Sequence, residues 1–261
     1  VALYYNKAMV KVPPATIEDL MTLAKASTDA ANDRWGLVYE AANLYFHAPW
    51  IHGYDGQVLD DSDKAWADTD PAENALKFAR RLLQEDKVAA PSVTAAMVSG
   101  YFNDGKAAMV INGPWMRGEL EGVDYGVATM PTVEGRPAKP FLGVEAVFLN
   151  KKSQNKKAAL EVMRFLVSNQ SAAIRAEVGK QPVANQAIWD SGKGVDDVMK
   201  VFYKQAADSV GMSGSPRMQQ VWTPYNDALL SVVAGEAEPR EALGTAQKKM
   251  EADMLRAGGG Q

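Results

Sequence analysis

The sequence contains no cysteine and only two histidines. The lack of thiols excludes disulfide bonds, thiolate metal sites and a cysteine nucleophile. His47 and His52 are five positions apart, so they do not share a helix face at the three- or four-residue spacing that a helical metal pair uses. We therefore expect no metal site and no cofactor.

The motifs of common catalytic and nucleotide-binding folds are also absent, because no G-x-S-x-G elbow, P-loop or G-x-G-x-x-G occurs. Most carboxylates follow helical charge patterns that are typical of solvated faces. Glu145 interrupts the apolar run 141–149, which indicates either a cleft or hinge carboxylate or a paired structural one. A glycosidase would need two carboxylates that flank one cleft, and no such pair can be named. The sequence therefore gives little support for catalysis, and we expect no catalytic residues.

An excess of positive charge and long apolar runs are lacking as well. The net charge is −4 over 261 residues, which argues against a nucleic-acid partner. No apolar run approaches the length needed to cross a bilayer. The chain begins at Val1 within a strand-like run and shows no signal peptide. We expect it to be a processed product or a piece of a longer protein.

Strands and helices alternate over the first 150 residues, which predicts an α/β fold. Caps and turn residues set the expected helix ends, with Thr16 and Asp19 forming a capping box, Asp70 before Pro71, and Ser92 opening the next helix. Strands are expected at 1–5, 35–39, 107–111, 125–130 and 143–149, and helices at 17–27, 70–86, 92–103, 155–167, 171–178, 195–207, 218–234 and 240–256.

One stretch combines a buried strand with an aromatic exit. An apolar run from Ala107 to Ile111 stops at Asn112 and Gly113, and Pro114 then fixes the backbone for a first helical turn that carries Trp115. A large aromatic ring with an N–H group at a strand exit suits a small-molecule cleft. A core position for Trp115 is the competing interpretation.

Other aromatic residues fall near loop–helix junctions and beside amides. Flat apolar rings next to planar polar groups suit a sugar, whose C–H faces stack on a ring while its hydroxyls need donors and acceptors. The aromatics of this set are Tyr45, Phe46, Trp50, Trp115, Trp222 and Tyr225, and the polar neighbours are Asn43, Asn112, Asn226 and Asp227.

Several segments carry a family resemblance. The run Gly105-Lys-Ala-Ala-Met-Val-Ile-Asn-Gly-Pro-Trp115 resembles a motif of the extracytoplasmic sugar-binding proteins of ABC importers, above all the maltose/maltodextrin-binding proteins. Further matching segments lie in the family's order at 3–7, 44–51, 123–127, 139–144, 155–156, 212–222 and 241–248. The resemblance implies a two-lobed, type II periplasmic-binding-protein fold that closes on sugar and docks on a membrane permease, and an extracytoplasmic or periplasmic location.

The resemblance also implies a set of sugar-binding residues. Tyr45, Trp115 and Trp222 fall where the family stacks sugar rings, and Phe46 lines the same wall. Asn43 stands where maltose binders often carry an acid, and Asn226 where they often carry Arg. Met212 belongs to the late segment that brings Trp222 to the cleft. Ala48 replaces a frequent Trp, and Trp50 is the candidate that compensates for it.

By the same resemblance, the N-terminal lobe is incomplete. We expect 1–142 to form the C-terminal-lobe portion, 143–190 to return to the N-terminal lobe, 191–257 to cross back, and 258–261 to be a flexible tail. The expected partners are an oligosaccharide, the permease subunits, and either the missing lobe segment or a second copy. The alternative is a domain of a larger sugar-transport membrane protein, or an interaction module with weak sugar affinity.

Overall fold

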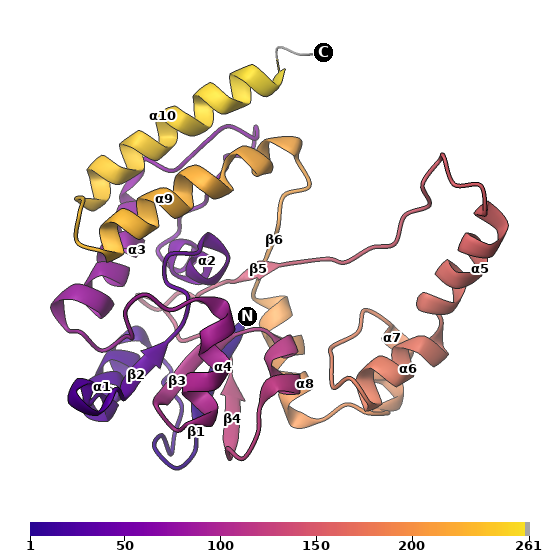
Figure 1. Ribbon diagram of the computed structural model, residues 1–261, viewed down its shortest axis with the longest axis horizontal. Coiled ribbons are helices and arrows are strands. Elements are labelled where there is room, and N and C mark those ends of the chain that lie inside the picture. The colour runs from indigo at the N-terminus through magenta and orange to yellow at the C-terminus, as the bar shows by residue number, and fades with distance from the viewer. Residues whose placement is uncertain (259–261) are drawn as a thin grey trace.

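The computed structural model describes residues 1–258, in which a projecting arm extends from a body built on a sheet (Figure 1). The body is built on a four-stranded mixed sheet of order β2-β3-β1-β4. Its strands are β1 (Ala2–Asn6), β2 (Trp35–Val38), β3 (Ala107–Asn112) and β4 (Tyr125–Ala128), and a separate two-stranded sheet joins β5 (Phe141–Leu142) to β6 (Val210–Gly211).

Strand β3 lies inside the sheet and is buried at all six positions. It pairs in parallel with β2, with Leu37 opposite Met109, and antiparallel with β1, with Tyr4 opposite Val110. A strand buried on both faces needs a near-continuous apolar sequence, and residues 107–111 supply one. The predicted strand at 107–111 is confirmed.

The helices of the body cover both faces of this sheet. Thr16 and Asp19 form the expected capping box at the start of α1. Two other helix starts lie close to their expected places. Thr69 caps α3 in place of Asp70. Helix α4 begins after Thr94 and not after Ser92, whose left-handed backbone (φ 54°) differs from the extended conformation of a helix cap. The body helices are α1 (Ile17–Ser27), α2 (Leu44–Gly53), α3 (Asp70–Arg80), α4 (Ala95–Asn103), α8 (Asp197–Ala207), α9 (Trp222–Val233) and α10 (Pro239–Gly258).

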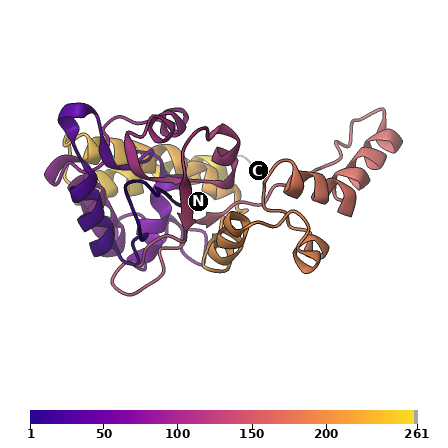
Figure 2. The same ribbon diagram turned by 90° about the horizontal axis from the view of Figure 1, so that it is seen from below.

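Alternate residues of β1 point to opposite faces and belong to separate cores. Leu3 joins the larger cluster, which packs under α1, α2, α3, α9 and α10. Tyr4 joins the smaller one with Val110, Phe102 and Phe202, beneath α4 and α8. Segments from both ends of the chain therefore build one body (Figures 1 and 2).

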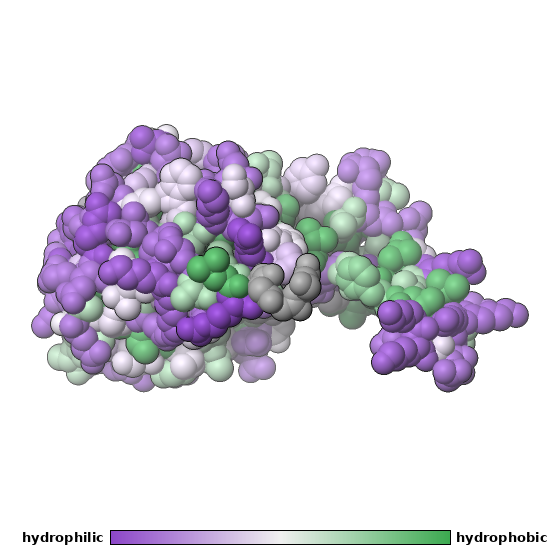
Figure 3. Space-filling model, turned by 90° about the horizontal axis from the view of Figure 1, so that it is seen from above, coloured by the Kyte–Doolittle hydropathy of each residue, from purple (hydrophilic) through white to green (hydrophobic). Residues whose placement is uncertain are grey.

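The arm comprises residues 143–191 and projects away from the body in both ribbon views (Figures 1 and 2). It holds an extended stretch and then α5 (Lys156–Leu166), α6 (Asn169–Glu177) and α7 (Gln186–Ser191). The predicted strand at 143–149 is wrong: this stretch is extended but pairs with no strand among residues 1–258, and Val144 and Phe148 are 82% and 88% exposed. Hydrophobic surface gathers on the arm in the space-filling view (Figure 3).

The C-terminal helix α10 runs to Gly258, the first residue of the expected tail, and 259–261 lie outside the described residues. Within residues 1–258, no helix combines the length and the apolar character needed to span a bilayer.

Helix α2 carries a histidine into the core. His47 is fully buried, and neither ring nitrogen has a hydrogen-bond partner within residues 1–258. Burial lowers the pKa of His47 to about 3, because the charged ring would lose its hydration. The folded protein therefore holds this side chain neutral.

His47 should make the fold sensitive to acid. The unfolded chain takes up a proton near pH 6.5 and the folded chain does not, so His47 lowers the free energy of unfolding as the pH falls from about 6.5 to 3. At about pH 4.5 this loss is roughly 2–3 kcal/mol. His47→Leu should remove it, as measured by urea denaturation at about pH 7.5 and 4.5. An equal pH-dependent loss in the variant would contradict the prediction.

Candidate functional site

Trp115 stands at the exit of β3, where side chains bind both polar backbone groups of Gly113. The side chain of Asn112 accepts a hydrogen bond from Gly113 N at 2.8 Å, and the Tyr4 hydroxyl donates to Gly113 O at 2.8 Å. A 3-10 turn, Pro114–Glu119, follows at once. Trp115 is 44% exposed, so it is not a core residue.

The indole of Trp115 lies directly against the backbone of Gly113. A Cβ atom on Gly113 would lie 2.1 Å from two carbons of the six-membered ring of the indole. At that distance either the new Cβ atom or the ring would have to move. Glycine at this position therefore allows the ring to fold back over the strand exit.

Two aromatic side chains of α2 extend this surface. The ring centroids of Tyr45 and Trp115 are 6.2 Å apart, at an interplanar angle of 45°. Phe46 packs edge-on against Tyr45 at 5.6 Å and is almost buried. Tyr45 and Trp115 form an accessible aromatic surface, and Phe46 supports it from the core.

A second aromatic group lies beside the other end of α2. Trp222, the first residue of α9, is half-buried and packs edge-on against Phe141 at 6.0 Å. Phe141 in turn contacts His52, whose Nδ1 lies 2.5 Å from the carbonyl oxygen of Lys139. Residues 141–143 link the two groups, because a Cβ on Gly143 would lie 3.9 Å from the Tyr45 hydroxyl. Neither Phe141 nor His52 was among the residues expected to bind sugar.

The expected amides bind the first turn of α2. Asn43 Oδ1 accepts from Tyr45 N at 2.9 Å, and its Nδ2 donates to Glu40 at 2.9 Å. Asn226 Oδ1 accepts from Leu44 N at 2.8 Å. These bonds satisfy backbone N–H groups that a helix start leaves unpaired, and so fix the position of Tyr45.

Met212 and Glu145 border the aromatic groups. Met212 is 39% exposed, and its N–H donates to Leu142 O in the two-stranded sheet at 3.2 Å. Glu145 is exposed, and both burial and the negative charge of Glu145 raise the pKa of Tyr45.

Two expected aromatics belong to the core. Trp50 is fully buried and packs edge-on against Phe78 at 5.1 Å, so it does not replace the ring that is lost at Ala48. Tyr225 is also fully buried. Both side chains project from the sides of α2 and α9 that face the larger hydrophobic cluster.

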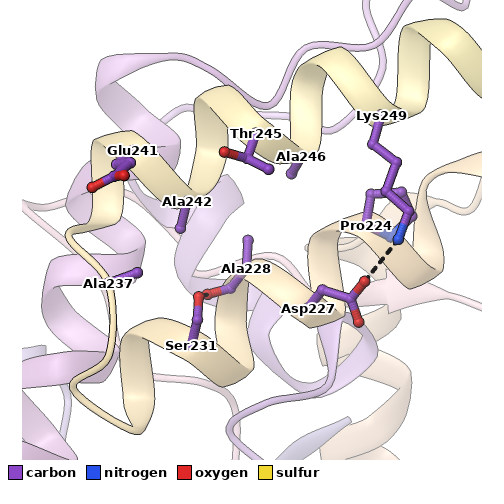
Figure 4. A pocket seen from close by; sticks show the side chains of 10 residues that line it. All are labelled: Pro224, Asp227, Ala228, Ser231, Ala237, Glu241, Ala242, Thr245, Ala246 and Lys249. Carbon is purple, nitrogen blue, oxygen red and sulfur yellow. Dashed lines mark hydrogen bonds and ion pairs between the residues drawn. The ribbon is translucent and has the colours of Figure 1, made fainter.

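A groove between α9 and α10 has a volume of about 280 Å³ (Figure 4). Its walls are mostly small side chains, such as Ala228, Ser231 and Ala242, and an ion pair of 2.9 Å joins Asp227 to Lys249 at one end. It offers no aromatic ring, so the exposed aromatic surface is the stronger candidate site. Residues 1–258 contain no group of three or more His, Cys, Asp or Glu side chains that could hold a metal.

Residues 1–173 match the family model of the bacterial extracellular solute-binding proteins. The chain belongs to this family. The match confirms the resemblance seen in the sequence and assigns the chain to a class of binding proteins rather than enzymes.

Relatives of this solute-binding protein carry sugar-binding names. The galactooligosaccharide-binding protein of Bacillus subtilis is 26% identical, over 92% of this chain and 61% of its own length. The maltotriose-binding protein of Pyrococcus abyssi is 25% identical, over 98% and 57%. The chain thus spans about 60% of the length of these relatives.

Solved structures confirm the type II periplasmic-binding-protein fold over part of its length. The maltose/maltodextrin-binding domain from Bdellovibrio bacteriovorus, bound to maltotriose, superposes with a TM-score of 0.87 at 26% identity. The match covers 97% of this chain and 70% of that one.

Gly113→Ala should displace the Trp115 indole, since the new methyl group occupies the position of the ring. We expect a shifted Trp115 signal in the ¹⁹F spectrum of protein labelled with 5-fluorotryptophan. Gly118→Ala, in the same turn, is the matched control because a Cβ there meets nothing within 4 Å. An unchanged Trp115 signal in Gly113→Ala would show that the ring does not rest on this glycine.

Proposed function

We propose that this solute-binding protein binds a maltose- or maltodextrin-like oligosaccharide for uptake through an ABC importer. The observation that carries the proposal is the exposed Trp115 ring next to Tyr45. This ring follows directly after β3, a strand that is buried at every position. Contiguous exposed apolar surface is a mark of sites that meet a partner or ligand.

The sugar would stack on Trp115 and Tyr45, and a further ring of the oligosaccharide on Trp222. Each stacked pair contributes about 0.5–1.5 kcal/mol beyond the burial of apolar area. Two or three such contacts are consistent with micromolar binding after the entropy cost of association. Phe46 supports the wall, Met212 borders it, and Asn43 and Asn226 act indirectly by fixing Tyr45.

We also propose that residues 1–142 and 191–257 form the C-terminal lobe, and that 143–190 belongs to the N-terminal lobe. The exposed apolar side chains of the arm support this division, because α5 has no buried residue within the described chain. The rest of the N-terminal lobe, or a second copy, would cover them. Closure of two lobes on a sugar is a hinge motion, and the permease subunits would recognise the closed form.

The sugar-binding proposal is separable from the alternative of an interaction module with weak sugar affinity. Maltotriose, maltotetraose and a galactooligosaccharide can be titrated by calorimetry into this chain and into a longer version with a complete N-terminal lobe. Saturable binding of a maltooligosaccharide supports the proposal. No binding of any oligosaccharide by either version would overturn it.

Trp115→Ala should weaken maltooligosaccharide binding by about tenfold, because it removes one stacking surface. Trp66→Ala is the matched control: Trp66 is 43% exposed, as Trp115 is 44%, but it lies in a loop that is bound to α10. Calorimetry should therefore show weaker binding in the first variant only. Equal affinity of Trp115→Ala and the parent chain would contradict the assignment of Trp115.

A further inference from the structure

Three segments of the chain meet behind the Trp115 turn. Arg117 follows Trp115 by two residues, and its side chain is only 9% exposed. Its Nη2 donates to Asp196 Oδ2 at 2.5 Å, and its Nη1 donates to Asp196 Oδ1 at 3.3 Å and to Lys180 O at 2.9 Å. A planar guanidinium that binds both carboxylate oxygens is held in position and direction.

The same turn is held at a second point. Gln181 Nε2 donates to Pro114 O at 3.1 Å, directly before Trp115. Lys180 presents its carbonyl to Arg117 from a left-handed backbone, φ 53°. Residues 180–181 of the arm therefore contact the turn on both sides of Trp115.

Asp196 connects this contact to the helices of the arm. Its Oδ1 accepts from Met199 N at 2.9 Å and so caps α8. The Met199 side chain is fully buried in a small cluster with Ala172 and Ala176 of α6 and Ile188 of α7. A continuous path of contacts leads from the Trp115 turn through Arg117 to α6 and α7.

The burial of Arg117 distinguishes this pair from the other ion pairs. Among the described residues, every other Lys or Arg side chain in an ion pair is at least 24% exposed. Exposed pairs contribute little to stability, and a buried pair is costly to desolvate. What such a pair does supply is a fixed geometry, here between an accessible aromatic ring and the arm.

We propose that Arg117 is a positioning residue: its bonds to Asp196 and Lys180 fix the orientation of Trp115 relative to the arm. This contact couples the stacking of a sugar on Trp115 to the placement of the arm. The coupling to sugar rests on the proposed function. The positioning of Trp115 does not, and it can be measured without a ligand.

The test uses the full chain labelled with 5-fluorotryptophan, with the Trp115 signal assigned from Trp115→Phe. Arg117→Gln removes the guanidinium group that binds Asp196 and Lys180. Asp196→Asn removes the carboxylate but keeps an amide oxygen that can cap α8, so the fold is retained. Arg136→Gln, which removes an exposed pair with Glu134, is the control. Maltotriose affinity is measured by calorimetry for the same variants.

We expect Arg117→Gln and Asp196→Asn to shift or broaden the Trp115 signal and to weaken maltotriose binding roughly fivefold or more, while Arg136→Gln changes neither. An unchanged Trp115 signal in both variants overturns the proposal. A changed signal with unaltered maltotriose affinity overturns the coupling. A changed signal supports the positioning role even if neither this chain nor the longer version binds an oligosaccharide, a result that would overturn the proposed function alone.

Discussion

The complete burial of β3 is the constraint on which the site depends. A strand with no contact to water must pair every backbone group, and β1 and β2 provide this pairing along its length. At its end no strand continues, so the Asn112 side chain and the Tyr4 hydroxyl bind the backbone of Gly113 instead. This pairing holds the strand exit rigid, and the absence of a side chain at Gly113 lets the Trp115 ring lie on it.

Some aromatic residues of this chain pack in the core and others lie at the surface, and their positions around each helix determine which. Helix α2 presents Tyr45 to the surface while it buries Trp50 and His47. Composition cannot separate these roles, because the buried and accessible rings are chemically alike and lie within six positions of one another. The direction of each side chain is set only when α2 packs against the following helix α3 and against α9, which is far away in sequence.

Features with a local cause could be predicted from the sequence, and those with a distant cause could not. The β3 strand, the turn at Pro114 and the capping box at Thr16 follow from residues within one or two turns of each other. The strand at 143–149 failed because a strand requires a partner, and the described chain supplies none. The bond from Leu44 N to Asn226 was not predicted for a similar reason, because the two residues are 182 positions apart.

A small apolar cluster and a few directional polar contacts join the arm to the body. Within residues 1–258, helix α5 buries no residue and the extended stretch before it pairs with no strand. The attachment lies at 180–199, where α7 and α8 share a small core and Arg117 binds Asp196 and Lys180. Directional bonds break and re-form over short displacements, whereas a large apolar interface resists separation. This attachment combines a small apolar contact with directional bonds, and it lies immediately behind the turn that carries the exposed Trp115 ring.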